Sequence, residues 1–169
     1  MTYSIGFRAP AQGECAQDLL QRLADVAGDS SGARYADRAQ DAAQHPAAIP
    51  PELQAFARRA VEQALADPHA LDRAMGESLS EPKAQVFFEP GVASAAGGLL
   101  VLDRRTRMLY DARHLFINGE SYRAGGKDFV LLKTLADRRH LGAADAARLS
   151  RPAQVLLHEW LEMGWVQRP

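Results

Sequence analysis

Five histidines carry the side chains best suited to bind a transition metal: His45, His69, His114, His140 and His158. A facial metal site takes two imidazoles and one carboxylate, and a His-x-Asp pair on one strand would supply two of these ligands. None of the five histidines is followed two residues later by Asp or Glu. The sequence therefore predicts no metal site of this type.

Other residue types that could do chemistry also lack a supporting motif. Cys15 is the only cysteine, which excludes an internal disulfide and a CxxC metal site and favours a cytoplasmic location. Gly125-Gly126-Lys127 lacks the remaining residues of a phosphate-binding loop. Ser78 and Ser80 have no base at a recognisable spacing. No catalytic residue is predicted.

The first ten residues alternate polar and apolar side chains, which is the period of a strand with two unlike faces. Pro10 ends this pattern, because proline has no N–H to donate and restricts the residue before it. The backbone groups of a strand need partners, but the next strand candidate is Val86–Phe88. The opening strand is thus predicted to belong to a sheet that the following residues do not form.

Three alanine-rich helices are predicted next, over residues 11–28, over 51–66 and from Asp67-Pro68 onwards, where an N-cap residue precedes a proline. Their apolar stripes are thin. The stripe of the first helix is Cys15, Leu19, Leu23 and Val26, and that of the third is Leu71, Met75 and Leu79. The stripes could form an internal core or half of a subunit interface. Because such helices make a poor core alone, we expect self-association.

After Pro82 the pattern changes to short strand candidates. These are residues 86–88, 99–102, 108–110, 115–117 and 121–122. Asn118-Gly119 predicts a hairpin with a type I′ turn. The remaining elements are a helix from Gly126 with Gly142 as its C′ residue, a short helix at 143–149, a helix capped by Ser150, and a strand at 165–166. This order is typical of a winged-helix-like module.

The last helix is where such a module would contact nucleic acid. Its predicted buried residues are Val155, Leu156, Trp160 and Met163, and its predicted outward residues are Gln154, His158, Glu159 and Glu162. The two outward acids would repel phosphate. Arginines gather near the start of this helix: Arg138, Arg139, Arg148 and Arg151. We nevertheless expect no nucleic-acid partner.

Charge divides along the same boundary. Residues 1–82 have 7 Lys and Arg against 12 Asp and Glu, whereas residues 83–169 have 13 against 9. This suggests separate modules, but the basic surplus is too small to argue for nucleic-acid binding without a clustered patch. No apolar run approaches the ~20 residues that a membrane span requires.

Several phrases of this sequence have counterparts, in the same order, in one known family. They are residues 3–10 (Tyr-Ser-Ile-Gly-Phe-Arg-Ala-Pro), Arg34–Asp37, His45–Ala47 with Pro50, Gly97–Leu99 and Asn118–Glu120. The chain resembles the bacterial cupin-fold (JmjC-type) ribosomal oxygenases, most closely at residues 3–10. That family hydroxylates an arginine of a large-subunit ribosomal protein with Fe(II) and 2-oxoglutarate.

The resemblance implies an α+β architecture in three parts. Residues 1–10 would be a remnant of the last strand of the cupin (JmjC) double-stranded β-helix, 11–82 a helical dimerisation region, and 83–169 a C-terminal winged-helix-like domain. It also implies a homodimer and a ribosomal-protein partner. Thr2 and Ser4 are the candidate cofactor-binding residues, because the matching strand face in the family points into the barrel near the 2-oxoglutarate site. Residues 29–50 are either a solvated loop or, in the full-length relative, a segment beside that pocket.

The family's iron site, a His-x-Asp pair with a distant His, is absent from this sequence. Fe(II) and 2-oxoglutarate are therefore expected for the full-length family and not for this chain, and whether the chain is itself an enzyme stays open. The chain is either a truncated gene product, which we favour, or a short protein that kept only the non-catalytic parts. An in-frame His-x-Asp segment upstream would indicate truncation. The competing function is a stand-alone helical and winged-helix interaction or regulatory module.

Overall fold

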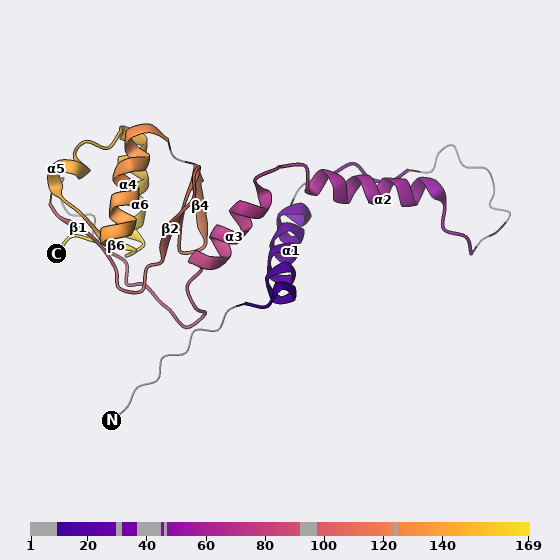
Figure 1. Cartoon of the computed structure of the whole chain (residues 1–169), viewed down its shortest axis with the longest axis horizontal. Coiled ribbons are helices and arrows are strands. Elements are labelled where there is room, and N and C mark those ends of the chain that lie inside the picture. The colour runs from indigo at the N-terminus through magenta and orange to yellow at the C-terminus, as the bar shows by residue number, and fades with distance from the viewer. Residues whose placement is uncertain (1–9, 30–31, 37–44, 46, 92–97, 124) are drawn as a thin grey trace, which may run out of the picture. The chain divides into compact units, whose positions relative to one another are not determined.

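The computed structural model describes residues 10–29, 32–36, 45, 47–91, 98–123 and 125–169 (Figure 1). They fall into two compact units, here called unit 1 (up to Ala74) and unit 2 (Met75–Pro169). The candidate residues Thr2 and Ser4 lie outside the described residues, as does the predicted opening strand up to residue 9. The predicted domain limits at residues 10 and 82 stay predictions.

Unit 1 contains α1 (Gln12–Asp29), α2 (Pro51–Ala64) and the first half of α3 (Ala70–Ser80). The helices predicted at 11–28 and 51–66 are thereby confirmed. α3 begins at Ala70, two residues later than the predicted start at Pro68, and a turn around Asp67 precedes it. The Asp67 carboxylate accepts hydrogen bonds from the His69 N–H and from the Arg73 guanidinium, both at 2.9 Å. The bond from His69 satisfies a backbone donor at the start of α3, and the bond from Arg73 ties the first turn of the helix to Asp67.

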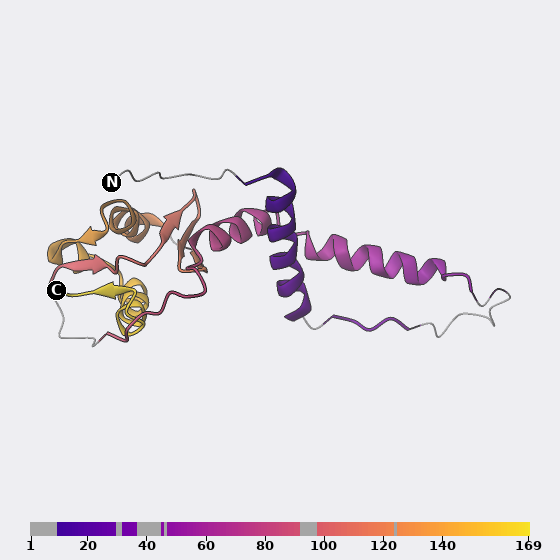
Figure 2. The ribbon, with the colours of Figure 1, turned by 90° about the horizontal axis from the view of Figure 1, so that it is seen from below.

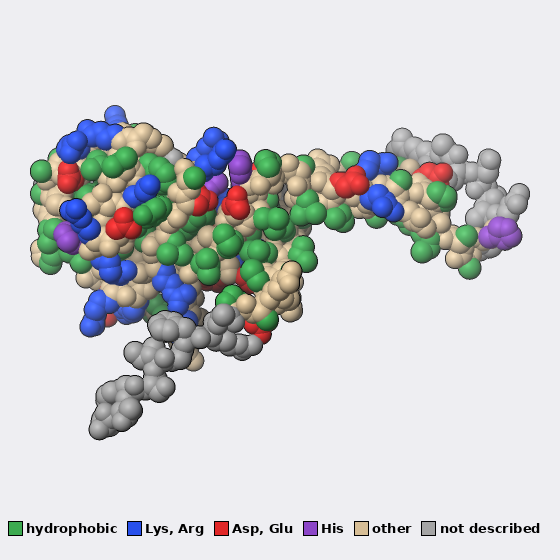
Figure 3. Space-filling model, viewed as in Figure 1, with side chains coloured by type: hydrophobic (Ala, Val, Ile, Leu, Met, Phe, Trp, Pro, Cys, Tyr) green, Lys and Arg blue, Asp and Glu red, His purple; other side chains and the backbone are tan. Residues whose placement is uncertain are grey.

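The apolar stripes of these helices lie largely at the surface. Leu23 is the buried residue of α1, and no residue of α2 is buried, in helices that the structure describes in full. Hydrophobic side chains that stay more than half exposed include Leu20 at 58%, Val26 at 59% and Val61 at 61%. Figure 3 shows such side chains on the surface of α1 and α2. The stripes thus leave apolar area that the described residues do not cover.

In unit 2, β2 (Met108–Tyr110), β3 (His114–Ile117) and β4 (Glu120–Arg123) form an antiparallel meander. The β3–β4 turn places Asn118 at φ 49° and Gly119 at φ 93°, so both central residues have the positive φ of a type I′ hairpin, as predicted. All residues of β3 are buried. Leu115 and Ile117 belong to the main core of the unit, while Phe116 points to the opposite face.

A second small sheet joins distant parts of unit 2. β1 (Leu100–Leu102) lies between β5 (His140–Leu141) and β6 (Val166–Gln167), and it is antiparallel to both. The register pairs Leu100 with Leu141 and Leu102 with Val166. Figure 2 shows β1 as the middle of the three arrows. The central strand of this sheet therefore comes from a segment that precedes the helices.

The helices of unit 2 are α4 (Gly126–Arg138), α5 (Ala143–Ala146) and α6 (Arg151–Glu162). Ser150 caps α6 as predicted, accepting a hydrogen bond from the Ala153 N–H. Helix, strand, short helix, helix and strand follow one another as in a winged helix. The hydrophobic core includes Leu132, Leu135 and Trp160, which are at most 2% exposed.

Three predictions about unit 2 were wrong. α4 ends four residues before Gly142, because Arg139 adopts the left-handed conformation at φ 61° and β5 follows. Val86–Phe88 is not a strand: the Val86 N–H donates to the Lys83 carbonyl, and the Phe87 carbonyl accepts from the Arg105 side chain. Val155 and Met163 do not face the core: they are 54% and 43% exposed. The buried residues of α6 are Ala153, Leu157, Trp160 and Leu161.

Candidate functional site

The histidines do not converge on a metal site. Within the described residues, no group of three or more His, Cys, Asp and Glu side chains is placed to hold a metal ion. His114 instead lies 3.2 Å from the Asp111 carboxylate, and His158 lies 3.4 Å from Glu162. These are pairs of one histidine and one acid, which stabilise local structure but supply too few ligands for a metal. The described part of the chain does not fit an iron centre.

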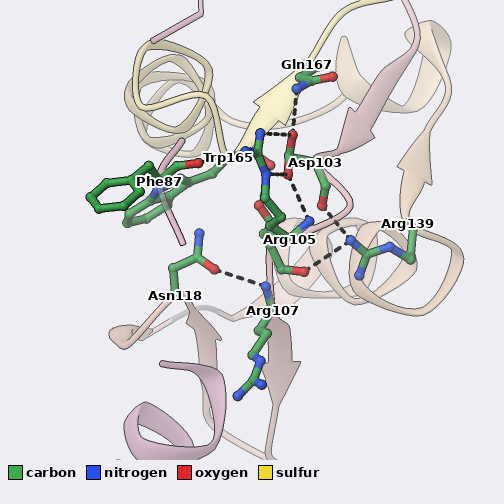
Figure 4. Close-up of polar contacts among 9 residues, drawn as sticks. Phe87, Asp103, Arg105, Arg107, Asn118, Arg139, Trp165 and Gln167 are labelled. Carbon is green, nitrogen blue, oxygen red and sulfur yellow. Dashed lines mark hydrogen bonds and ion pairs between the residues drawn. The ribbon is translucent and has the colours of Figure 1, made fainter. Parts of the chain in front are cut away.

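The most connected polar site is centred on Asp103, which follows β1 and is 8% exposed (Figure 4). Its carboxylate accepts hydrogen bonds from the backbone N–H of Arg105 at 2.8 Å and from the guanidinium of Arg105 at 2.9 and 3.1 Å. The Gln167 side chain donates a further bond at 2.8 Å. The turn after β1 is thereby joined to β6, its neighbour in the sheet.

Two more side chains extend this network. The Arg139 guanidinium donates to the backbone carbonyls of Asp103 at 2.7 Å and Thr106 at 3.1 Å, and the Thr106 hydroxyl donates to the Trp165 carbonyl at 2.9 Å. Arg105 also donates to the Phe87 carbonyl at 2.8 Å. Each of these donors binds an acceptor within unit 2, so the network stabilises the turns of this unit.

The charge of Asp103 makes the stability of unit 2 depend on pH. The hydrogen bonds from the Arg105 side chain hold the pKa of Asp103 below its usual range. A lowered folded-state pKa gives stability that is complete above the unfolded-state pKa of about 3.9 and is lost as pH falls through the folded-state value. We expect the stability advantage of the wild type over Asp103→Asn to shrink below about pH 4 in urea titrations. A difference that stays constant down to the lowest pH would contradict this role for the charge.

A further contact in unit 2 holds the C-terminal end of α6. The Gly91 N–H donates to the Glu162 carbonyl at 3.1 Å, and the Trp165 N–H donates to the Trp160 carbonyl at 2.9 Å. Gly164, the residue after the C-cap of α6, has φ 72° in this turn, as expected for a Schellman motif. The carbonyl of Glu89 lies so close that a Cβ on Gly164 would be 1.9 Å from its oxygen.

The second half of α3 packs against the β3–β4 hairpin within unit 2. The Ser121 hydroxyl donates to the Glu77 carboxylate at 2.5 Å, and the Gly119 N–H donates to the Ser80 hydroxyl at 3.1 Å. Gly76 lies directly over the ring of Phe116, where a Cβ would be 2.2 Å from the nearest ring atom. This close approach needs a residue without a side chain at position 76.

The face of α6 that a DNA-binding winged helix uses for base contacts presents Glu159 and Glu162 to solvent. Of the four arginines singled out in the sequence, Arg139 is committed to the carbonyls above and Arg148 pairs with Asp145 at 2.9 Å. On the face seen in Figure 3, unit 2 shows more blue side chains than red ones, with red ones among them. The two exposed acids of α6 would nevertheless repel a phosphate backbone placed against that helix.

Unit 1 contains an apolar groove of about 520 Å³ between its helices. Its lining includes Leu23 and Val26 from α1, and Ala60 and Ala64 from α2. The Asp67–Arg73 ion pair, with its charged atoms 2.9 Å apart, also lines the groove. Together with the exposed stripes, the groove makes unit 1 a surface suited to another apolar helix.

Residues 63–167 match the family of ROXA-like winged helix domains. This match covers more than half of the 169 residues. The chain belongs to the ROXA-like winged helix family. The strand and helix order of unit 2, with its small β5–β1–β6 sheet, is the structural form of this ROXA-like winged helix.

The likeness of this chain to solved structures extends beyond the ROXA-like winged helix. A structure of YcfD, a ribosomal oxygenase from Escherichia coli in complex with cobalt and succinic acid, is 20% identical and has a TM-score of 0.64 over 96% of this chain. A second structure of E. coli YcfD is 19% identical, with a TM-score of 0.67 over 98% of this chain. A third, in complex with cobalt and 2-oxoglutarate, is 20% identical with a TM-score of 0.65.

The chain spans about half the length of these solved proteins, with 46–47% of each covered. At this identity the likeness establishes the fold. No curated protein sequence matches the chain. No helix among the described residues is both long and apolar enough to cross a membrane.

Sequence reasoning did not identify the residues that connect the ROXA-like winged helix most tightly. Asp103 and Gln167 are 64 positions apart and share no motif. Gly76 and Gly164 gave weak signals, because a glycine within or after a helical pattern is common. A useful sign was available for Asp103, which directly follows a strand candidate and precedes two arginines.

Proposed function

We propose that this chain forms the C-terminal portion of an Fe(II)- and 2-oxoglutarate-dependent ribosomal oxygenase that hydroxylates an arginine of a large-subunit ribosomal protein. The observation that supports this most is the fold likeness to E. coli YcfD, which covers 96–98% of this chain and combines the helical unit with the ROXA-like winged helix. A likeness confined to unit 2 would have suited any winged helix. Such an enzyme would act in the cytoplasm, where ribosomes are.

The described residues do not fit the metal, so we assign them no chemical step. Their proposed task is to bind a second copy of the chain and to hold the fold in position. Unit 1 offers exposed apolar helices and a groove for a second copy of the chain, and unit 2 offers a fold held together by the Asp103 network. The surplus of acid in residues 1–82 suits the neighbourhood of a basic ribosomal protein.

The proposal is tested by deleting the gene that encodes this chain and measuring the masses of intact large-subunit ribosomal proteins. We expect one protein to lose the mass of one oxygen atom, and fragmentation to place the loss on an arginine. Unchanged masses for all large-subunit proteins, under growth conditions in which the gene is expressed, would overturn the proposal. That result would favour the second candidate, a helical and winged-helix interaction module, which the exposed stripes of unit 1 also suit.

The proposed homodimer gives a separate prediction. Val61 on α2 is 61% exposed, and an aspartate there would place a charge in an apolar interface between two copies. We expect Val61→Asp to weaken the dimer at least about tenfold, measured by sedimentation equilibrium. Arg59→Asp, on the polar side of the same helix, is the matched control and should leave the dimer intact. A monomeric wild type, or equal effects of both variants, would exclude α2 as the interface.

A further inference from the structure

Asn118-Gly119 forms the hairpin turn, and the same dipeptide is also a sequence in which asparagine can deamidate without an enzyme. Asn118 is the only asparagine in the chain. When glycine follows asparagine, no Cβ obstructs the approach of the glycine nitrogen to the side-chain amide carbon. Asn-Gly is therefore the pair in which asparagine loses its amide most readily.

The reaction needs only water as co-reactant. The Gly119 nitrogen gives up its proton and bonds to Cγ of Asn118, the Cγ–Nδ2 bond breaks, and ammonia leaves with a proton. Water then opens the resulting succinimide ring at one of its two carbonyl carbons. The product is aspartate, or isoaspartate if the main-chain carbonyl bond opens, and no oxidant or reductant is involved.

The structure holds the attacking group in place. The Gly119 N–H donates to the Ser80 hydroxyl at 3.1 Å, and the same hydroxyl donates to the Glu77 carbonyl at 3.2 Å. Ser80 is fully buried where α3 packs against the hairpin. For attack, the Gly119 nitrogen must leave this bond and turn towards the side chain of Asn118.

The electrophilic group is held as well, while the leaving group is not. The Asn118 Oδ1 atom accepts a hydrogen bond from the Arg107 N–H at 3.0 Å, and the Asn118 N–H donates to the Arg107 carbonyl at 3.0 Å. Asn118 is 9% exposed, so little water reaches it. Its Nδ2 atom is buried without a hydrogen-bond partner among the described residues. No bond at this atom opposes the departure of ammonia.

We propose that Asn118-Gly119 is a latent deamidation site, kept unreactive by the docked second half of α3 and exposed to reaction when that half moves away. Reaction would be irreversible. Isoaspartate adds one carbon to the backbone of the turn, and either product adds a carboxylate beside the Glu81 end of α3. After deamidation, the second half of α3 therefore could not pack on the hairpin in the same way. Each molecule in which α3 had once moved away and Asn118 had reacted would stay modified.

The test follows deamidation of the full chain by peptide mapping with mass spectrometry during incubation at neutral pH. Three proteins are compared: the wild type, Ser80→Ala and Ser150→Ala. Ser80→Ala removes the acceptor of the Gly119 N–H. Ser150→Ala removes the N-cap of α6 and the bond that the Ser150 hydroxyl donates to Asp128, and Ser150 is far from the hairpin in sequence. The wild type in urea gives the rate of the unprotected dipeptide.

We expect the folded wild type to react more slowly than the unfolded chain, and Ser80→Ala to react about fivefold faster than the wild type, as expected for loss of one hydrogen bond. Ser150→Ala should stay near the wild-type rate. If Ser150→Ala is accelerated as much as Ser80→Ala, reaction proceeds through global unfolding and the protective role of α3 is wrong. Equal rates for folded and unfolded wild type would also overturn it. Circular dichroism of each variant confirms that it is folded during the assay.

Discussion

Replacement of Gly164 by alanine is expected to destabilise unit 2 by about 3 kcal/mol, the sum of a backbone penalty and a steric one. Gly164 has φ 72°, a conformation that costs a residue with a Cβ about 1 kcal/mol. The new methyl group would also be 1.9 Å from the Glu89 carbonyl oxygen, and this neighbour is backbone, so it cannot rotate away. Both ends of the clash belong to unit 2.

Two other glycines separate these contributions. Gly126 has φ 59° but open space around its Cβ position, so Gly126→Ala reports the backbone penalty alone. Gly91 has no positive φ, but its Cβ would be 2.2 Å from the Leu161 carbonyl oxygen, so Gly91→Ala reports the steric cost. Gly142→Ala has neither problem and carries only the smaller cost of alanine at the N-cap of α5.

The measurement is urea unfolding followed by tryptophan fluorescence, because both tryptophans of the chain, Trp160 and Trp165, are in unit 2. We expect Gly164→Ala to lower the free energy of unfolding most, Gly91→Ala and Gly126→Ala less, and Gly142→Ala least. If Gly164→Ala costs no more than Gly126→Ala, the segment that contains Glu89 does not pack against the end of α6 in solution.

The second large effect is expected at Gly76, where the sign of the change is informative. Alanine is about 1 kcal/mol more favourable than glycine in a helix interior, so propensity alone predicts stabilisation. The alanine Cβ would, however, be 2.2 Å from the Phe116 ring, and Phe116 is only 2% exposed and has little room to move. Overpacking of this kind costs about 1–3 kcal/mol, so we expect net destabilisation of unit 2.

A double-mutant cycle identifies the contact responsible. Phe116→Leu removes the ring, so Gly76→Ala should cost less in that background than in the wild type, by a coupling energy of about 1 kcal/mol or more. Gly28→Ala in α1 has no neighbour within 4 Å and is the control for propensity; because Gly28 lies in unit 1, its unfolding is followed by circular dichroism, and it should be neutral or stabilising. Additive effects of Gly76→Ala and Phe116→Leu would show that α3 does not rest on the ring.

These glycines illustrate what the sequence could and could not predict. Elements with strong local signals were found: α1, α2, the Asn118-Gly119 hairpin and the Ser150 cap all lie where periodicity or turn chemistry placed them. The buried face of α3 was not found, because the helix approaches the hairpin so closely that small residues such as Gly76 and Ser80 are buried there. Periodicity selects the large apolar residues Leu71, Met75 and Leu79 instead, and these are exposed.

The end of α4 and the Asp103 site could not be predicted for a different reason. Both depend on contacts between residues far apart in the chain. Arg139 takes a left-handed conformation, and its guanidinium binds the carbonyls of Asp103 and Thr106. Nothing within a few residues of Arg139 indicates that partner. For α6, the apolar residues allow two helical faces, and the core selected the one with Leu157 and Trp160.

The β5–β1–β6 sheet has a consequence for how unit 2 is made. β1 is synthesised before any of the helices α4 to α6, yet its two neighbours are residues 140–141 and 166–167. Contacts so distant in the chain require a long loop to close first, which slows folding. On the ribosome, one edge of the central strand can pair with residues 140–141, but the other edge stays unpaired until residue 167 has left the exit tunnel. This sheet should therefore be completed late, only when nearly all of unit 2 has been synthesised.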